Sequence, residues 1–239
     1  MFSDRQIAII AGVLWITATT AYSLAVIILS PILTALDYLI SVSSNQTQVL
    51  IAMLLELTDA AAVAGIAIML FPILRKYSEG LALSYVGARI IESVTVIVSV
   101  IFMLSLINVS QEFVSTGVPE ASYFQALGTL LLAARDWTNL IGINFVFGLG
   151  ALILYYLLYQ SKLVPRFISV WGLIGATLLF IAGLLMMFGL LTPLSVVETV
   201  MNIPIAVQEM VLAVWLIVKG FDSSAIASES TTHSLKKQK

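Results

Sequence analysis

Residues 49–74 read VLIAMLLELTDAAAVAGIAIMLFPIL, a long apolar run interrupted by two carboxylates, Glu56 and Asp59. A helix needs about 20 mostly apolar residues to cross the hydrocarbon core of a bilayer, and this run is longer than that. A transmembrane β-strand would instead alternate apolar and polar residues, which stretches such as 66–70 and 149–154 do not. The run therefore predicts a transmembrane helix.

Similar runs recur along the whole chain. Of its 239 residues, 60% are hydrophobic and 10% are charged, whereas a soluble domain carries roughly a quarter charged residues. The mean hydropathy is +1.07. We predict an all-α, polytopic transmembrane bundle over residues 1–220 and a flexible cytoplasmic tail at 221–239. The predicted spans are 7–29, 49–74, 81–107, 136–159, 165–190 and 196–218.

The connections carry recognisable breaks. Pro31 is expected to end the first helix, and the polar segment 45–48 to open the second with capping residues. The stretch from Asn108 to Arg135 is the longest connection. We expect a loop there, followed by helix that lies at the outer surface, extends the fourth span or forms an additional short span.

The basic residues set the orientation. With six alternating spans, one side of the membrane receives Arg5, Arg75, Lys76, Lys162, Arg166 and Lys219, and the other receives Arg135. Cytoplasmic loops are the ones enriched in lysine and arginine, so both termini are expected in the cytoplasm and the chain in the cell membrane. The first apolar segment exceeds the about 7–15 residues of a cleavable signal, so we expect it to remain as a span.

Composition excludes several chemistries. The chain has no cysteine and one histidine, His233 in the polar tail, which excludes thiol chemistry and histidine-rich metal sites. No cofactor or metal is expected. The net charge of −2 does not suggest nucleic acid, so the bilayer itself is the expected partner. At 25.9 kDa the chain is small for a transporter, which suggests a homo-oligomer.

Several motifs together resemble a known family. They are LELTD at 55–59, YVGARIIES at 85–93, AARDW at 133–137, SKLVPR at 161–166 and QEM at 208–210. The chain resembles the family of small prokaryotic integral membrane proteins called domain of unknown function 4386. The resemblance implies a multi-span membrane protein and no particular activity.

Charged residues inside the spans are the main functional signal. Each one at the bilayer centre costs about 2.5–3.5 kcal/mol on insertion scales. Five such residues lie within the predicted spans, namely Glu56, Asp59, Arg89, Glu92 and Glu209. If all five faced lipid, they would cost on the order of 12–18 kcal/mol, which matches or exceeds the stability of a whole domain, about 5–15 kcal/mol. They should therefore face the bundle interior. With nearby polar residues, the candidate ligand- or proton-binding set is Glu56, Asp59, Arg89, Glu92, Arg135, Asp136, Asn139, Asn202 and Glu209.

Helical spacing groups these candidates on shared faces. The pairs Glu56/Asp59, Arg89/Glu92 and Asp136/Asn139 are each three residues apart, and Asn202 and Glu209 are two turns apart. Depths estimated along the helices predict a polar column. In that column Arg89 is expected to pair with Glu92 or Glu209, and Arg135 with Glu56 or Asp136.

Acidic residues outnumber basic ones in this column. Five carboxylates, counting Asp136, face two guanidinium groups, so three positive charges are missing. Burial and neighbouring like charges both disfavour an ionised carboxyl. We expect at least one acid to hold a proton at neutral pH, or a cation or amine to bind there.

Three functions remain open at this point. The first is binding, sensing or transport of a small polar or cationic ligand or of protons. The second is an intramembrane acid–base enzyme acting on a lipid or isoprenoid, for which no catalytic residue is assigned and no nucleophile is evident. The third is a structural or accessory subunit, in which the polar cluster serves assembly alone.

Overall fold

A computed structural model describes residues 2–116, 121–193 and 195–222. In these residues the chain is helical, and six helical segments are long and apolar enough to cross a membrane. The predicted all-α, six-span fold is confirmed. The elements are α1 (Asp4–Leu33), α2 (Tyr38–Ser44), α3 (Gln46–Leu74), α4 (Glu79–Thr116), α5 (Ala121–Asn139), the π-helix η2 (Leu140–Phe147), α6 (Gly148–Ser161), α7 (Arg166–Met187) and α8 (Val196–Val218).

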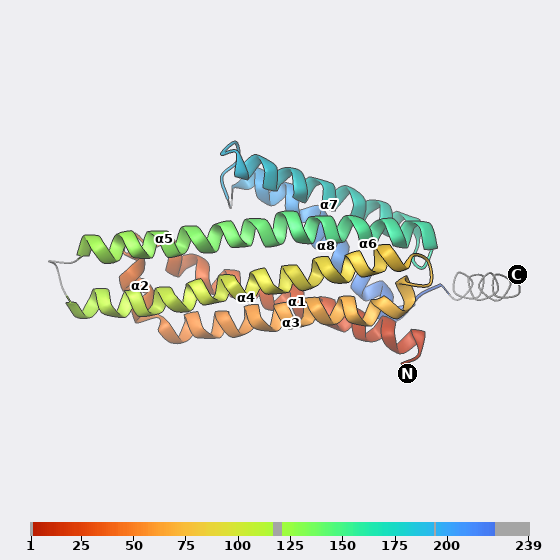
Figure 1. Ribbon diagram of the computed structural model, residues 1–239, viewed down its shortest axis with the longest axis horizontal. Helices are drawn as coiled ribbons and strands as arrows, with labels where there is room; N and C mark the ends of the chain where they lie inside the picture. Colours follow the sequence, from red (N-terminus) through yellow and green to blue (C-terminus); the bar gives the residue numbers. More distant parts are fainter. Residues whose placement is uncertain (1, 117–120, 194, 223–239) are drawn as a thin grey trace, which may run out of the picture.

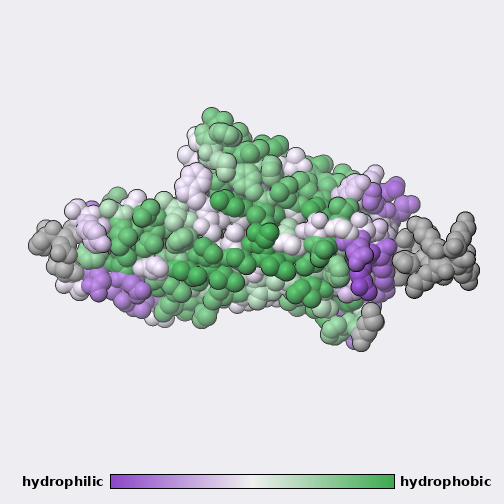
Figure 2. Space-filling model, in the orientation of Figure 1, coloured by the Kyte–Doolittle hydropathy of each residue, from purple (hydrophilic) through white to green (hydrophobic). Residues whose placement is uncertain are grey.

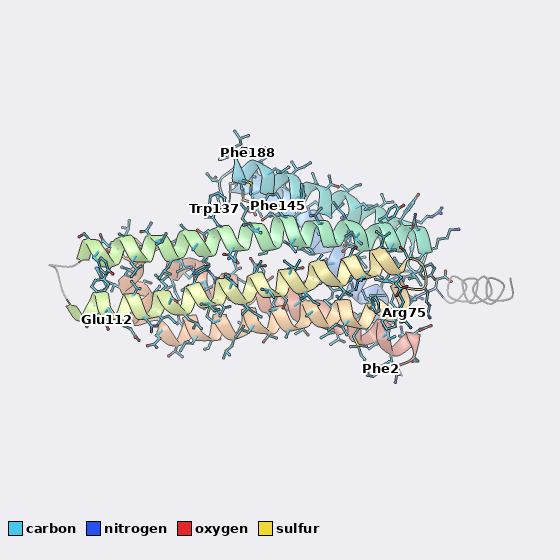
Figure 3. The ribbon with its side chains drawn as sticks, in the orientation of Figure 1. Phe2, Arg75, Glu112, Trp137, Phe145 and Phe188 are labelled. Atoms are coloured by element: carbon cyan, nitrogen blue, oxygen red, sulfur yellow. The ribbon has the colours of Figure 1, made fainter. Side chains whose placement is uncertain are left out.

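The spans form a closed ring. Helix α1 packs on α3, α3 on α4, α4 on the rod formed by α5, η2 and α6, α6 on α7, α7 on α8, and α8 returns to α1. The start of α1 and the end of α8 lie at the same end of the bundle (Figure 1), together with Arg75 (Figure 3). Figure 2 shows hydrophilic residues gathered at the two ends and an apolar belt between them. The basic residues therefore share one end, and its cytoplasmic placement stays a prediction.

Local hydrogen bonds fix the ends of the first and last spans. Ser3 and Gln6 form a capping box at the start of α1. The Ser195 hydroxyl accepts the Glu198 N–H at the start of α8. Arg5 donates to the last carbonyls of α8, at 3.1 Å to Leu216, 2.6 Å to Ile217 and 3.3 Å to Val218. A single cation thus joins α1 to the C-terminus of α8 and satisfies its free carbonyls.

The predicted loop after Asn108 is mostly helix. Helix α4 continues to Thr116, and α5 begins at Ala121 and runs without a break into the fourth span. No glycine or proline occurs between Asn108 and Thr116, so nothing in this stretch breaks the helix. Of the alternatives, the structure shows an extension of the fourth span. Residues 117–120 and the predicted tail at 223–239, including His233, lie outside the described residues.

Smaller expectations also need correction. Helix α1 continues past Pro31 to Leu33, and the short helix α2 was not predicted. Asn45 does precede α3, but its side chain donates back to the Ser41 carbonyl at 2.8 Å and does not cap α3. Helix α7 ends at Met187, before the predicted end at residue 190, because the chain turns at Gly189 with φ of 69°.

Two rods project beyond α7 and α8. Helix α4 has 38 residues and α7 has 22, which correspond to about 57 Å and about 33 Å. Helices α4 and α7 both begin at the basic end, so α4, with α5 running antiparallel beside it, extends further at the opposite end, where Glu112 lies (Figures 1 and 3). Trp137 is level with the outer end of α7 near Phe188 (Figure 3). A separate buried cluster that includes Leu39, Met103 and Leu106 holds the projecting part together.

Candidate functional site

The outer part of the site is a buried ion pair between α5 and α3. Arg135 Nη1 donates to Glu56 Oε2 at 3.2 Å, and Arg135 Nη2 donates to Glu56 Oε1. Arg135 Nη1 also donates to the Ser99 hydroxyl at 2.9 Å and to the Ser99 carbonyl at 3.1 Å. The Arg135, Glu56 and Ser99 residues are 6%, 2% and 0% exposed. Three helices therefore meet at one two-pronged guanidinium–carboxylate contact, the geometry that arginine favours.

The inner part is a second ion pair within α4. Arg89 Nη1 donates to both oxygens of Glu92, at 2.9 Å and 3.2 Å. The guanidinium carbon lies 5.0 Å from the centre of the Phe147 ring and 6.0 Å from that of Tyr85. Arg89 Nε is buried without a hydrogen-bond acceptor. The predicted pairing of Arg89 with Glu92 is present, as is that of Arg135 with Glu56.

Glu209 on α8 lies beside the inner pair. Its Oε1 accepts the indole N–H of Trp15 at 3.0 Å, and Trp15 is buried. Glu209 is close enough to Arg89 to interact with it electrostatically, but no salt bridge joins them. The carboxyl group is thus held by a neutral donor and has no cation in direct contact.

Asp59 is the second acid without a cation. It is 8% exposed, and within the described part of the chain no donor makes a hydrogen bond to its carboxyl group. Arg89, Glu209 and Glu56 are its charged neighbours. Asp59 therefore lies between the two ion pairs and is a partner of neither.

The π-helix sets which side chains of the long rod face the site. Phe147 follows Arg135 by twelve residues, a separation that would turn it by about 120° in a regular α-helix. A π-helix takes more residues per turn, and this brings both side chains to the interior. The segment is anchored by Asn144, whose amide donates to the Leu179 carbonyl at 3.2 Å. It is also packed tightly at Gly142, where an added Cβ would collide with the side chain of Thr95.

The remaining predicted residues lie apart from this centre. Asp136 is exposed, which corrects its expected place on an interior face. Arg135 points into the bundle, and the side chains of consecutive helical residues point about 100° apart around the helix axis. Asp136 therefore cannot face the interior as well. Asn139 is half-buried at the start of the π-helix. Asn202 is half-buried and donates to Glu198 at 2.5 Å, near the outer end of α8.

Removing Asp136 changes the charge count. The interior holds four carboxyl groups and two guanidinium groups, and two of the acids are engaged in ion pairs. The deficit of positive charge is therefore two, and it belongs to Asp59 and Glu209. The interior still contains more acidic than basic groups, but the excess is two and not the predicted three.

Several residues of the site were missed from the sequence. The spacing of the charged residues does not point to Trp15, although its position near the middle of the first span is a signal against a membrane-interface role. Ser99 and Phe147 carried no signal, because their contacts depend on how the helices pack. Gln208 is fully buried beside Glu209 and donates to the Ile168 carbonyl at 3.1 Å; its place in the QEM motif was the available clue.

The space beside Glu209 and Arg89 is small. A void there is too small to hold a water molecule and is lined by Trp15, Tyr85, Arg89, Phe147, Ala151, Leu154, Tyr155 and Glu209. Among the described residues, no group of three or more His, Cys, Asp or Glu side chains is arranged to hold a metal ion. A proton can therefore move between side chains that are already in the site, whereas the helices must separate before a larger ligand enters.

Comparison with known proteins agrees with the resemblance noted above. A family model described as a domain of unknown function, DUF4386, matches residues 10–220. The chain belongs to the DUF4386 family. The DUF4386 match runs from within α1 to the end of α8 and thus includes every residue of the candidate site. No curated protein and no solved structure matches the chain.

Proposed function

We propose that this membrane protein binds protons at Asp59 and Glu209 and couples their binding to its conformation, as a proton-linked sensor or transporter. The observation that carries the proposal is the pair of interior carboxyl groups without a contacting cation. An isolated carboxylate in an apolar interior is far more costly than a neutral acid. Proton binding is the simplest way for both groups to remain inside the bundle.

The closed interior favours a proton over a larger ligand. The void beside Arg89 and Glu209 is too small to hold a water molecule. The polar end of Arg89 is occupied by Glu92 and its flat face by Phe147. A proton needs no volume, whereas a polar molecule or an isoprenoid substrate would require the helices to separate. The same lack of space speaks against the enzyme alternative.

Arg89 is the group through which proton binding acts on the fold. It interacts electrostatically with Glu92, Glu209 and Asp59. When Asp59 or Glu209 loses its proton, the new negative charge competes with Glu92 for the guanidinium. A shift of Arg89 would disturb its contact with Phe147 at the end of η2. The π-helix would carry that change toward Arg135, which lies in the same rod.

A structural role alone fits the site less well. A bundle built only for assembly is expected to pair its buried charges, because an unpaired buried charge is strongly destabilising. Arg135 with Glu56 and Arg89 with Glu92 meet that expectation, whereas Asp59 and Glu209 do not. The two unpaired acids therefore favour a proton-binding function over a purely structural one.

The test is to count the protons released when the purified protein unfolds in weakly buffered detergent at neutral pH. An acid that is neutral in the fold ionises on exposure to water, so protons appear in the medium. The wild type should release about two, one for each unpaired acid. The D59N/E209Q variant should release none, and the matched E56Q variant, which alters a paired acid, should release as many as the wild type. Equal release from D59N/E209Q and the wild type would reject the proposal.

A further inference from the structure

A second polar site, lined by none of the interior acids, lies at the basic end of the bundle. A pocket of about 360 Å³ is lined by Lys162, Leu163, Val164, Pro165, Arg166, Trp215, Lys219, Gly220, Phe221 and Asp222. Its volume falls within the roughly 300–1,000 Å³ of small-molecule sites. The pocket opens where the turn between α6 and α7 meets the end of α8.

The walls of the pocket are held in place by backbone interactions. The Asp222 N–H donates to the Leu163 carbonyl at 2.9 Å, which ties the end of α8 to the turn. Gly220 has φ of 76°, a conformation that L side chains rarely adopt. Arg5 fixes the last carbonyls of α8 and lies within 3.0 Å of the position that a Cβ on Gly220 would take. The pocket is therefore part of the fold and does not depend on chance side-chain positions.

Three cations face the pocket without anionic partners in contact. Lys162, Arg166 and Lys219 are exposed, and no salt bridge joins any of them to another described side chain. Arg166 stacks on Tyr159, with 5.2 Å between the guanidinium carbon and the ring centre. One carboxylate, Asp222, shares the lining. The pocket consequently carries excess positive charge.

The surroundings add an apolar surface beside this charge. Phe167 at the start of α7 is 60% exposed, and Val214 and Val218 on α8 are 53% and 62% exposed. Trp215 lies in the pocket itself, at the depth where tryptophan favours the membrane–water interface. A ligand with an anionic head and an apolar tail would satisfy both surfaces at once.

We propose that the Lys162–Arg166–Lys219 pocket binds the phosphate headgroup of an anionic phospholipid, with its acyl chains lying along the exposed apolar residues of α7 and α8. The basic end of the bundle is the one predicted to face the cytoplasm, and basic pockets between membrane helices on that side suit anionic headgroups. This proposal does not depend on proton binding at Asp59 and Glu209.

The test compares lipid binding by native mass spectrometry of the full chain, with phosphatidylglycerol as the anionic probe and phosphatidylcholine as the neutral one. Each basic residue near an anionic surface strengthens binding by about fivefold. The K162Q/K219Q variant should therefore bind phosphatidylglycerol about 30-fold more weakly than the wild type does. Binding of phosphatidylcholine should not change.

The matched control is R75Q/K76Q, which removes two cations from the same end of the bundle but outside the pocket. It should keep the wild-type affinity for phosphatidylglycerol. Equal weakening by both double variants, or no preference for phosphatidylglycerol over phosphatidylcholine in the wild type, would overturn the proposal. Displacement of the lipid by an equal concentration of inorganic phosphate would also overturn it and would assign the pocket to a soluble phosphate compound. Unchanged melting of both variants in phosphatidylcholine shows that they are folded.

Discussion

Replacing Arg135 by glutamine removes the cation that holds Glu56 inside the bundle. Glu56 is 2% exposed, and no other cation of the described residues forms a salt bridge with it. Glutamine is neutral and too short to reproduce the two-pronged contact. It also loses the bonds that Arg135 makes to the hydroxyl and carbonyl of Ser99. The variant therefore leaves polar groups of α3 and α4 without their partner.

The expected loss is large for a single substitution. Breaking a buried ion pair by removing one partner costs about 3–5 kcal/mol, a substantial part of the about 5–15 kcal/mol that stabilises a typical domain. Neutralising Glu56 as well should recover part of this loss. The E56Q/R135Q variant should thus be destabilised by less than the sum of E56Q and R135Q, with a coupling free energy of about 0.5–3 kcal/mol.

The assay is reversible unfolding of the purified protein in mixed micelles, with the free energy of unfolding measured for each variant. The control is the exposed pair of Lys76 and Asp4, whose charged atoms are 3.7 Å apart. Because exposed pairs contribute about 0–1 kcal/mol, K76Q should change stability by no more than that. If R135Q and K76Q cost the same, or if E56Q and R135Q add without coupling, the buried pair does not hold the helices together.

Two further predictions concern the packing of α1. A Cβ at Gly12 would lie 2.7 Å from the Ala213 carbonyl oxygen, so G12A should lower the free energy of unfolding by about 1–3 kcal/mol. The control G87A, where no atom lies within 4 Å of the added Cβ, should not lower it, and a loss equal to that of G12A would contradict the close contact of α1 with α8. Trp15→Phe keeps an aromatic ring but removes the donor to Glu209, so it should cost about 1–3 kcal/mol in the same assay. In an E209L background, which has no acceptor for the indole N–H, the cost should be smaller, and an unchanged cost would mean that Trp15 acts by packing alone.

Much of the fold follows from the sequence because apolar runs and basic turns are local signals. A turn does lie at Arg75 and Lys76, and each predicted span falls on a helix of the structure, although the span predicted at 165–190 runs past the end of α7 at Met187. The loop expected after Asn108 is wrong, because polar residues there continue α4 to Thr116. Ser110 is instead fully buried, and its hydroxyl donates to the Ile107 carbonyl at 2.7 Å. The π-helix had no sequence signal, since it arises from packing around Gly142.

The site was predictable where it depends on helical spacing. The contact between Arg89 and Glu92 follows from a separation of three residues on one helix. The choice of Glu56 over Asp136 as the partner of Arg135 depended on the arrangement of three helices. The hydrogen bond from Trp15 to Glu209 joins residues 194 positions apart. Such long-range contacts cannot be read from spacing, because spacing fixes faces within a helix and not the neighbours across the bundle.

The central claim is that Asp59 and Glu209 are neutral acids inside the folded bundle. Infrared spectroscopy of the protein in lipid at neutral pH measures this directly, because a protonated carboxyl group has a C=O stretching band that a carboxylate lacks. We predict that the wild type shows this band, that D59N and E209Q each weaken it, and that E56Q leaves it unchanged. A wild-type spectrum without the band, or an identical band in D59N/E209Q, would contradict the account.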